Sequence, residues 1–396
     1  MAIKWNSLVP TVSLMLQIYD VTEWEKSGYT PEAILTFASS AMMVKSGWKP
    51  KHNAVFIKPN VGATSLYVNT DPNVVRGIIH YLQGMGIEDI VVGEGSVETE
   101  YESTSYNFHH QGWDELAKKE NVELLDLNKC ERVAKPWKYG KEHGLGSLVL
   151  PEVLENRSYI NVAKLKTHMQ TLVSLCTKNQ KGLLDSSTRK RFHKWGLHEP
   201  IARLTEAVSP ELCVVDGYVG IEGNGPGDWG TQKKVGLLVA GDSMVEVDSA
   251  CCGLMGINPD DVEHLKLLRE YAHYSAFPVV HTEVTPFKRP DLSFKMFKTH
   301  LHPENACSAC LSSVGKMSKL ARKSWAGVKV FSRKGLLTRL DIVLGSPKDV
   351  PYRHGYLVFY GDCAKKLALR YSEYPFIQGC PPVSKRALEQ LAGSNH

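Results

Sequence analysis

Residues 54–95 decide the fold, and they read AVFIKPNVGATSLYVNTDPNVVRGIIHYLQGMGIEDIVVGEG. The apolar runs Ala54–Ile57 and Ile90–Val92 each predict a buried strand. Between them, Asp71-Pro72 is a typical helix start, and apolar residues then recur at helical spacing as far as Leu82. A strand, a helix and a second strand in about 40 residues form a βαβ unit, and such units build parallel sheets.

The same alternation continues toward the C-terminus. Further strands are predicted at residues 122–125, 159–162, 212–215 and 235–240, and helices at 113–119, 199–208, 245–255 and 259–274. Alternating strands and helices predict an α/β domain with a mostly parallel sheet flanked by helices. In such a domain we expect the functional groups in loops beyond the carboxyl ends of the strands.

A proline-rich stretch separates this domain from a smaller one. It covers residues 277–303 and contains four prolines, so we interpret it as a linker. Beyond it we predict a helix at 307–321, strands at 340–344 and 356–360, and a last helix at 383–391. The predicted organisation is an α/β substrate-binding domain over 1–276, the linker, and a C-terminal α+β domain over 304–396.

Composition excludes several classes of protein. The 396 residues include 47 Lys and Arg against 42 Asp and Glu, a net charge of +5 that is too small and too dispersed to indicate a nucleic-acid-binding protein. No apolar run approaches the roughly 20 residues of a membrane-spanning helix, and the first 20 residues lack a signal-peptide cleavage site. We therefore expect a cytoplasmic protein with neither a nucleic-acid partner nor a membrane partner. Assembly into a homo-oligomer is an alternative that the composition does not exclude.

Four of the nine cysteines fall in one 74-residue stretch. Cys307 and Cys310 form a C-x-x-C pair, and Cys363 and Cys380 each precede a predicted helix. Thiolates in this pattern predict a [4Fe–4S] site; a Cys₄ zinc site and a redox dithiol remain alternatives. The other cysteines, which lie mostly in apolar segments, are expected to be packing residues: Cys130, Cys176, Cys213, Cys251 and Cys252.

Polar motifs follow the predicted strands of the larger domain. Lysines, a histidine and a glycine-rich loop with free N–H groups suit an anion, either a carboxylate or a phosphate. A desolvated lysine can also transfer protons or form a Schiff base. The candidate catalytic residues are Lys58, Lys164, Lys166 and His168, and the candidate substrate-binding residues are Asn60, Lys178, Asn179, Asp216, Asn224, Gly225 and Asp242. The alternative interpretation is that these lysines are solvated and the loop is only a turn.

These motifs, in this order, resemble the domain-of-unknown-function family 362, which is widespread in anaerobic bacteria and archaea. The matching segments are 58–60, 93–95, 161–168, 178–182, 216–217, 222–226 and 242–256, within roughly residues 50–275. Members are often called iron–sulfur centre proteins, and many carry a ferredoxin-like segment with a compact C-x-x-C-x-x-C-x-x-x-C-P run. This chain lacks that run, so the expected cluster rests on its own four cysteines. The resemblance implies a fold and a site but no reaction.

The combined expectation is an iron–sulfur oxidoreductase or electron-transfer enzyme that acts on a small anionic substrate and exchanges electrons with a redox partner protein. Two alternatives stay open. The first is a non-redox enzyme, such as a lyase, ligase or isomerase, with a structural cluster or zinc. The second is an electron carrier or binding module without chemistry of its own.

Overall fold

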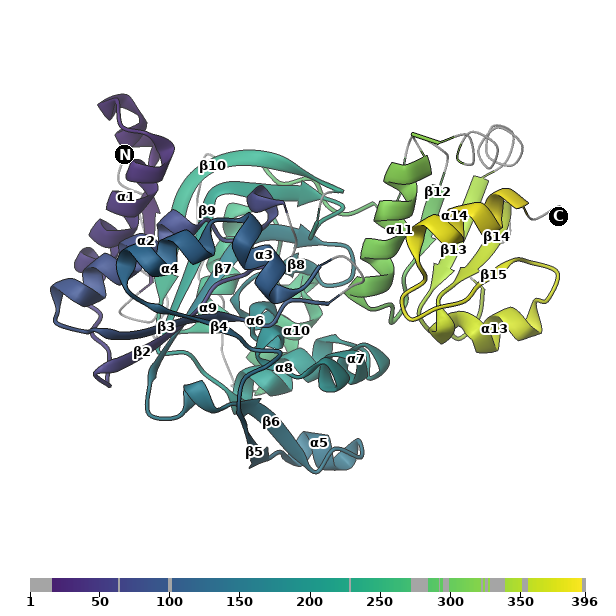
Figure 1. The fold of residues 1–396 in the computed structure, drawn as a ribbon, viewed down its shortest axis with the longest axis horizontal. Helices are drawn as coiled ribbons and strands as arrows, with labels where there is room; N and C mark the ends of the chain where they lie inside the picture. Colours follow the sequence, from purple (N-terminus) through teal and green to yellow (C-terminus); the bar gives the residue numbers. More distant parts are fainter. Residues whose placement is uncertain are drawn as a thin grey trace. The chain divides into compact units, whose positions relative to one another are not determined.

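The computed structural model describes residues 16–62, 65–98, 102–227, 229–271, 284–291, 293–294, 299–321, 323–324, 327, 339–350 and 355–393. The chain divides into two compact units (Figure 1). The first unit consists of Met1–Ser96, Glu102–Arg189 and His198–Pro290, and the second of Val97–Tyr101, Lys190–Leu197 and Asp291–His396. No helix in the described part of the chain is both long and apolar enough to cross a membrane.

An eight-stranded sheet forms the centre of the first unit, in the order β1-β10-β9-β7-β2-β3-β4, with β8 paired to β7. The five strands from β9 to β4 are mutually parallel, whereas β1, β8 and β10 pair antiparallel with their neighbours. The bounds are β1 (Gln17–Asp20), β2 (Ala54–Lys58), β3 (Asp89–Glu94), β4 (Glu123–Asp126), β7 (Ser158–His168), β8 (Leu172–Ser174), β9 (Leu212–Gly223) and β10 (Gly230–Gly241). The predicted mostly parallel sheet is confirmed.

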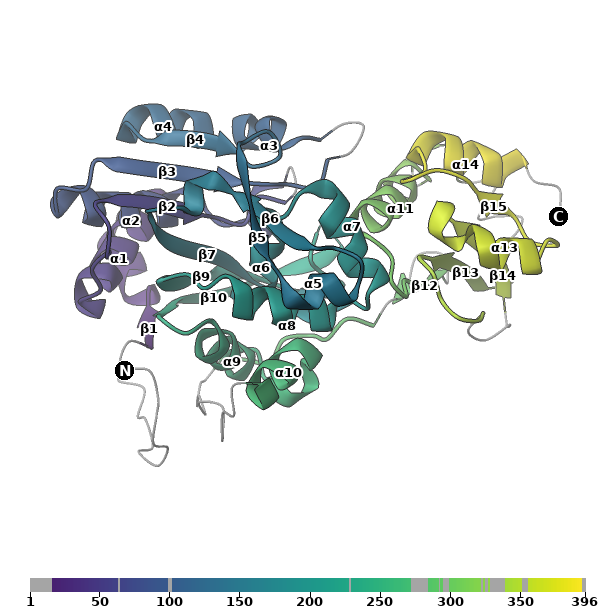
Figure 2. The same ribbon diagram turned by 90° about the horizontal axis from the view of Figure 1, so that it is seen from below.

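Helices cover both faces of this sheet (Figures 1 and 2). On one face lie α1 (Pro31–Ser46), α2 (Pro72–Gly84) and α4 (Trp113–Glu120), and on the other lie α6 (Cys176–Asn179), α8 (His198–Ala207), α9 (Met244–Leu254) and α10 (Glu263–Tyr271). Successive strand side chains point to opposite faces, so Val162 packs in the first core and Ala163 in the second. Burial on both faces explains why these strands are continuous apolar runs.

The start of α2 shows how the sequence builds this layer. The Asp71 side chain accepts a hydrogen bond from the backbone N–H of Asn73, and Pro72 occupies the first helical turn. This cap satisfies an N–H that the helix itself leaves open. Val74, Ile78 and Leu82 then follow on one face and are fully buried. The helix predicted from Asp71-Pro72 is confirmed.

Some elements of the first unit differ from the predictions. The helix predicted over 259–274 is divided into the short 3₁₀ segment η5 (Pro259–Asp261) and α10, and its last residues lie outside the described part. Strands β7, β9 and β10 extend beyond the apolar runs that predicted them. Elements that were not predicted include α3 (Thr104–His110), β5 (Arg132–Pro136), α5 (Lys138–Glu142), β6 (Ser147–Pro151) and η4 (Gln180–Leu183), in addition to β1, α1, α6 and β8. Helix α7 (Ser186–Lys194) was not predicted either, and its last residues belong to the second unit.

The second unit contains a five-stranded sheet in the order β11-β12-β13-β14-β15. Strands β12 to β15 are parallel, and β11 pairs antiparallel with β12. The bounds are β11 (Ser293–Phe294), β12 (Thr299–His302), α11 (Ser308–Ala321), β13 (Arg339–Leu344), β14 (Gly355–Tyr360), η7 (Asp362–Ala364), α13 (Lys365–Arg370), β15 (Phe376–Ile377) and α14 (Ser384–Gly393). Strands β11 and β12 thus belong to this sheet, although their residues fall within the stretch expected to be a linker.

Candidate functional site

A buried ion pair joins the ends of β2 and β3. The Nζ of Lys58 lies 2.8 Å from Oε1 of Glu94 and donates to Oδ1 of Asn179 at 3.2 Å. The second carboxylate oxygen of Glu94 accepts from the backbone N–H of Val61 at 3.1 Å. Burial lowers the pKa of Lys58, and the Glu94 charge opposes this shift. Sequence reasoning missed Glu94 as a site residue, although a carboxylate between two glycines at a strand end was a usable signal.

A second ion pair lies on the opposite face of the sheet. The Nζ of Lys164 on β7 is 2.8 Å from Oδ2 of Asp216 on β9, and both side chains are buried. Asp216 also accepts from the backbone N–H of Asp71 at 2.9 Å. Lys58 stands in register with Asn161, three residues before Lys164 on β7. Because side chains alternate along a strand, the two pairs project from opposite faces.

Asn60 connects the two faces around the sheet edge. Its amide nitrogen donates to Oδ1 of Asn179 at 3.0 Å, and its amide oxygen accepts from Nζ of Lys166 at 2.6 Å. Asn179 in turn donates to Oδ1 of Asn161 at 2.8 Å. Lys58, Asn60, Lys164, Lys166, Asn179 and Asp216 were all predicted as site residues. With Glu94 and Asn161 they form one cluster, which we call the strand-end network.

Lys166 is a buried cation whose hydrogen-bond acceptors are neutral. Its Nζ donates to the Asn60 amide and to the carbonyl oxygen of Val68 at 2.8 Å. Burial lowers the pKa of Lys166 to about 7, and the charges of Lys178 and Lys164 add to this effect. A lysine with such a pKa can exchange protons near neutral pH.

Lys178, in α6, is the cation whose charge affects Lys166 most. Burial lowers its pKa to about 8, and in the described part of the chain its ammonium has neither a hydrogen bond nor an ion pair. Lys58 and Lys164 thus each pair with a carboxylate, whereas no described carboxylate is bonded to Lys166 of the network or to the adjacent Lys178. This surplus of positive charge suits a small anion.

His168 and the glycine-rich loop lie further along the same edge. Nδ1 of His168 accepts from the backbone N–H of Gln170 at 3.0 Å. The carbonyl oxygen of Gly225 accepts from the N–H of Met169 at 3.0 Å. A Cβ at Gly225 would lie 2.2 Å from the carbonyl oxygen of Thr167, so only glycine permits this approach. Asn224 is half-buried beside it.

Asp242 does not join the other candidates. It is exposed and follows β10, which runs antiparallel to β9. Gly241 pairs with Cys213, and Cys213 is in register with Asn161 of the strand-end network. Asp242 therefore lies one residue past that row, on a strand two places from β7, and its assignment as a substrate-binding residue stays a prediction.

Sequence reasoning also missed a pair of histidines, of which His264 is buried and His198 half-buried. Nδ1 of His198 lies 3.3 Å from Nδ1 of His264, and Nε2 of His198 lies 3.2 Å from the carbonyl oxygen of Gln170. Because a carbonyl only accepts, His198 carries its proton on Nε2 and His264 donates from Nδ1 when both rings are neutral. Nε2 of His264 is then an acceptor, and no described group donates to it. Burial lowers the pKa of both rings, with a smaller contribution from the Lys178 charge.

The four candidate ligand cysteines gather at one edge of the second sheet. Cys307 and Cys310 follow β12, Cys363 follows β14, and Cys380 follows β15. These three strands are parallel, so their carboxyl ends share one edge. The backbone N–H of Asp362 donates to the carbonyl oxygen of Gly379 at 2.9 Å, which fixes the Cys363 and Cys380 loops side by side.

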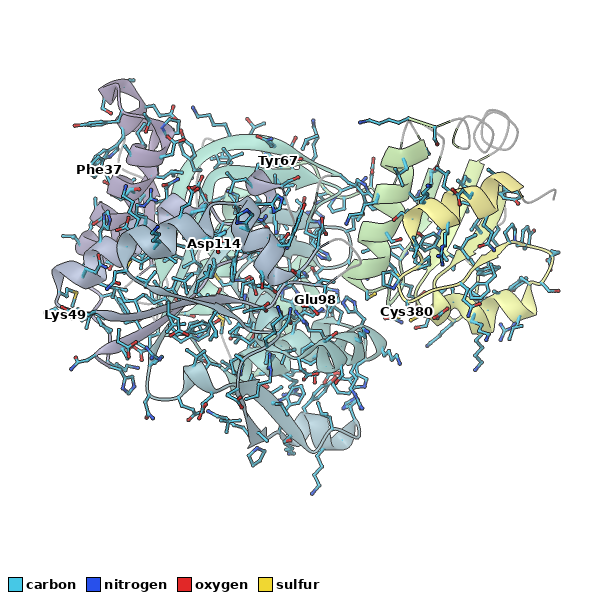
Figure 3. All side chains as sticks on the ribbon, in the orientation of Figure 1. Phe37, Lys49, Tyr67, Glu98, Asp114 and Cys380 are labelled. Atoms are coloured by element: carbon cyan, nitrogen blue, oxygen red, sulfur yellow. The ribbon has the colours of Figure 1, made fainter. Side chains whose placement is uncertain are left out.

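The thiols are close enough to affect one another. A hydrogen bond with Cys307 and then burial raise the pKa of Cys310, and the charges of Cys363 and Cys380 add to the shift. Burial, followed by the charges of Cys307 and Cys380, raises the pKa of Cys363. Cys310 is buried, whereas Cys363 and Cys380 are exposed (Figure 3 labels Cys380). The four thiols therefore lie close enough together for the charge of one to shift the pKa of another.

The four clustered cysteines are suitable ligands for a soft metal centre, because thiolates prefer soft metal ions. Crowded thiolates repel one another, and a cation between them removes that repulsion. A Cβ at Gly361 would lie 3.1 Å from Sγ of Cys310, so glycine keeps the space beside this sulfur open. The described residues contain no three His, Cys, Asp or Glu side chains already placed to hold a metal ion. Of the remaining cysteines, Cys130 is half-buried and the other four are buried in the core.

Comparison with known protein families shows which family the chain belongs to. A family model described as a domain of unknown function (DUF362) matches residues 55–253, half of the chain. The chain belongs to the DUF362 family. The matched residues run from β2 to α9, so they include the whole strand-end network and end before the four clustered cysteines. The family relationship predicted from the motifs is confirmed.

One curated relative is the thylakoid-associated protein of Synechocystis sp. It is 28% identical over 116 residues, which cover 27% of this chain and 35% of the relative. The chain thus spans about a third of that protein. No solved structure matches the chain.

Proposed function

We propose that this member of the DUF362 family is an iron–sulfur oxidoreductase or electron-transfer enzyme that acts on a small anionic substrate. In this proposal Cys307, Cys310, Cys363 and Cys380 hold a [4Fe–4S] cluster. The observation that carries it is the convergence of four thiols at the carboxyl edge of β12, β14 and β15. When bound, such a cluster supplies one-electron transfer.

Two features favour a cluster over zinc. Structural zinc sites commonly use two local C-x-x-C pairs, whereas this set has one pair and two cysteines from separate loops. Glycines with positive φ precede these two loop cysteines, at Gly361 and Gly379. The missing side chain at Gly361 leaves space beside Sγ of Cys310 that a bulky inorganic core requires.

The substrate is proposed to bind beside the strand-end network. Lys166 and Lys178 supply positive charge with no bonded carboxylate, and the loop around Gly225 lies along the same edge. A carboxylate or a phosphate would balance this charge. The substrate site lies within the family match, so other members are expected to bind related anions.

The cluster is tested by anaerobic purification and reconstitution with iron and sulfide. We expect about four irons and four sulfides per chain and an electron paramagnetic resonance signal after reduction. Cys307→Ser and Cys380→Ser should lose most of the iron, whereas Cys130→Ser, in the first unit, should retain it. Stoichiometric zinc with no iron after anaerobic reconstitution would overturn the proposal.

A non-redox enzyme with a structural cluster or zinc is the second candidate. The pKa of Lys166, about 7, favours it because that value suits proton transfer without any electron donor. Under this candidate, Cys380→Ser would leave phosphate binding and lysine reactivity in the first unit unchanged. Under the leading proposal, turnover of a substrate would require the cluster to change oxidation state.

We propose a cytoplasmic location without a stable membrane partner. The relative from Synechocystis is named for its thylakoid association, so cell fractionation is the appropriate measurement. Recovery of most of the chain with washed membranes would contradict the proposal.

A further inference from the structure

The edge of the second unit that carries the cysteines is also basic. Lys365 and Lys366 follow the exposed Cys363, and Lys385 and Arg386 follow the exposed Cys380. All four cations are exposed, and none of them forms an ion pair with any described residue. Asp362, the acid next to Cys363 in the sequence, has a carboxylate that accepts from the backbone N–H of Gly379 at 2.8 Å. We call this surface the basic cysteine face.

Local helix energetics do not explain these cations. Lys385 and Arg386 lie in the first turn of α14, which has no acidic residue there. Lys365 and Lys366 begin α13, which continues directly from η7 and its acidic Asp362. The N-terminal end of a helix carries partial positive charge, so lysine and arginine are slightly unfavourable at this position. These exposed cations, which have no ion-pair partner among the described residues, are available to a group that approaches this surface from outside.

We infer that the basic cysteine face docks an acidic electron-carrier protein. This inference rests on the proposed function, because the exposed Cys363 and Cys380 would place a bound cluster at the surface. Positive charge around the cluster would steer a negatively charged carrier toward it. The docked carrier would lose one electron and the cluster would gain one, with no bond formed and no proton moved. A protein carrier is favoured over nucleic acid because the cations form two short groups, on α13 and α14, and do not form a long stripe.

The test uses the full chain reconstituted with iron and sulfide, and a labelled plant-type ferredoxin as the acidic probe. We expect binding at low ionic strength that weakens steeply as salt is added. Lys365→Glu/Lys366→Glu should weaken binding by about tenfold or more. Lys385→Glu/Arg386→Glu provides a second variant on the other helix. Lys118→Glu/Lys119→Glu is the matched control, because it reverses two adjacent exposed lysines in the first unit.

Iron content is measured for every variant, so that binding is compared only between chains with equal clusters. Equal weakening in the control variant, salt-independent binding, or tighter binding of a DNA duplex than of ferredoxin would overturn the docking inference. A fully loaded chain that does not bind ferredoxin would overturn the docking inference alone. A chain that takes up no iron would overturn the proposed function.

Discussion

Around the Lys58–Glu94 pair, only glycine fits at position 182. A Cβ there would lie 2.0 Å from Oε1 of Glu94 and 2.7 Å from Nζ of Lys58. We expect Gly182→Ala to separate the pair and to lower the free energy of unfolding by about 3–5 kcal/mol, because a buried charge would lose its partner. Urea unfolding measures this loss.

Gly84→Ala is the matched control for this substitution. Gly84 ends α2, and nothing lies within 4 Å of the Cβ that the substitution would add. Alanine is the better helix former, so a gain of up to about 1 kcal/mol is expected. If Gly182→Ala and Gly84→Ala lowered the free energy of unfolding equally, the loss at position 182 would not come from the ion pair.

Lys166 should give the stability of the chain a pH dependence of defined sign. Its pKa is about 7 in the folded chain, whereas an unfolded lysine titrates near 10.4. Between these values the unfolded chain binds more protons, so the free energy of unfolding rises with pH. From about pH 7 to about pH 9.5, wild type should gain about 3 kcal/mol relative to Lys166→Met. Urea unfolding of wild type and Lys166→Met at both pH values measures this difference in the free energy of unfolding.

Lys118→Met serves as the control for this pH dependence, because Lys118 is exposed. Its free energy of unfolding should follow that of wild type across the same pH range. A constant difference between wild type and Lys166→Met would mean that Lys166 stays fully charged in the folded chain.

Individual residues of the site were partly predictable from the sequence. The lysines of the strand-end network follow apolar strands, so their position at a sheet edge could be inferred. Glu94 was missed because only the three-dimensional structure shows which cation a carboxylate meets. The antiparallel direction of β10 was not predicted, because it depends on distant pairing, which local sequence does not reveal.

At the scale of elements, the Lys164–Asp216 pair links β7 to β9. Asp216→Asn would leave a buried ammonium without its carboxylate, and we expect a loss of about 3 kcal/mol. Adding Lys164→Met should restore at least about 1 kcal/mol, because the double variant buries no unpaired charge. Unfolding free energies of the full double-mutant cycle measure this coupling.

The exposed pair Lys234–Glu25 is the comparison for this cycle. Lys234 is 60% exposed and lies 2.7 Å from Glu25, so Lys234→Gln should cost less than about 1 kcal/mol. A loss as large as that of Asp216→Asn would show that burial is not the source of the coupling.

Elements with a clear apolar pattern or a helix cap could be predicted from the sequence, whereas short or interrupted elements could not. Helices with a cap and an apolar face, such as α2, and apolar runs such as β2 were found from sequence. Strand β7 was underestimated because Lys164 and Lys166 interrupt its apolar pattern, and their partners are distant in sequence. Short elements such as β8 and β15 have too few residues to show a period, and only pairing with neighbouring strands defines them.

At the scale of the whole molecule, the two compact units should unfold in separate steps. Calorimetry should show two transitions. Phosphate should raise the midpoint of the first unit only, since Lys166 and Lys178 belong to it. Removal of iron by a chelator should lower the midpoint of the second unit only, and Cys380→Ser identifies that transition. A single transition that responds to both treatments would contradict this prediction.

The four clustered cysteines come from three strand ends that are far apart along the chain. A cluster on them would act as a cross-link that closes long loops and removes conformational entropy from the unfolded chain. A compact ferredoxin run closes only short loops and restricts the unfolded chain much less. In this unit, metal assembly and chain folding would then be one event, because the site exists only after the parallel strands have paired.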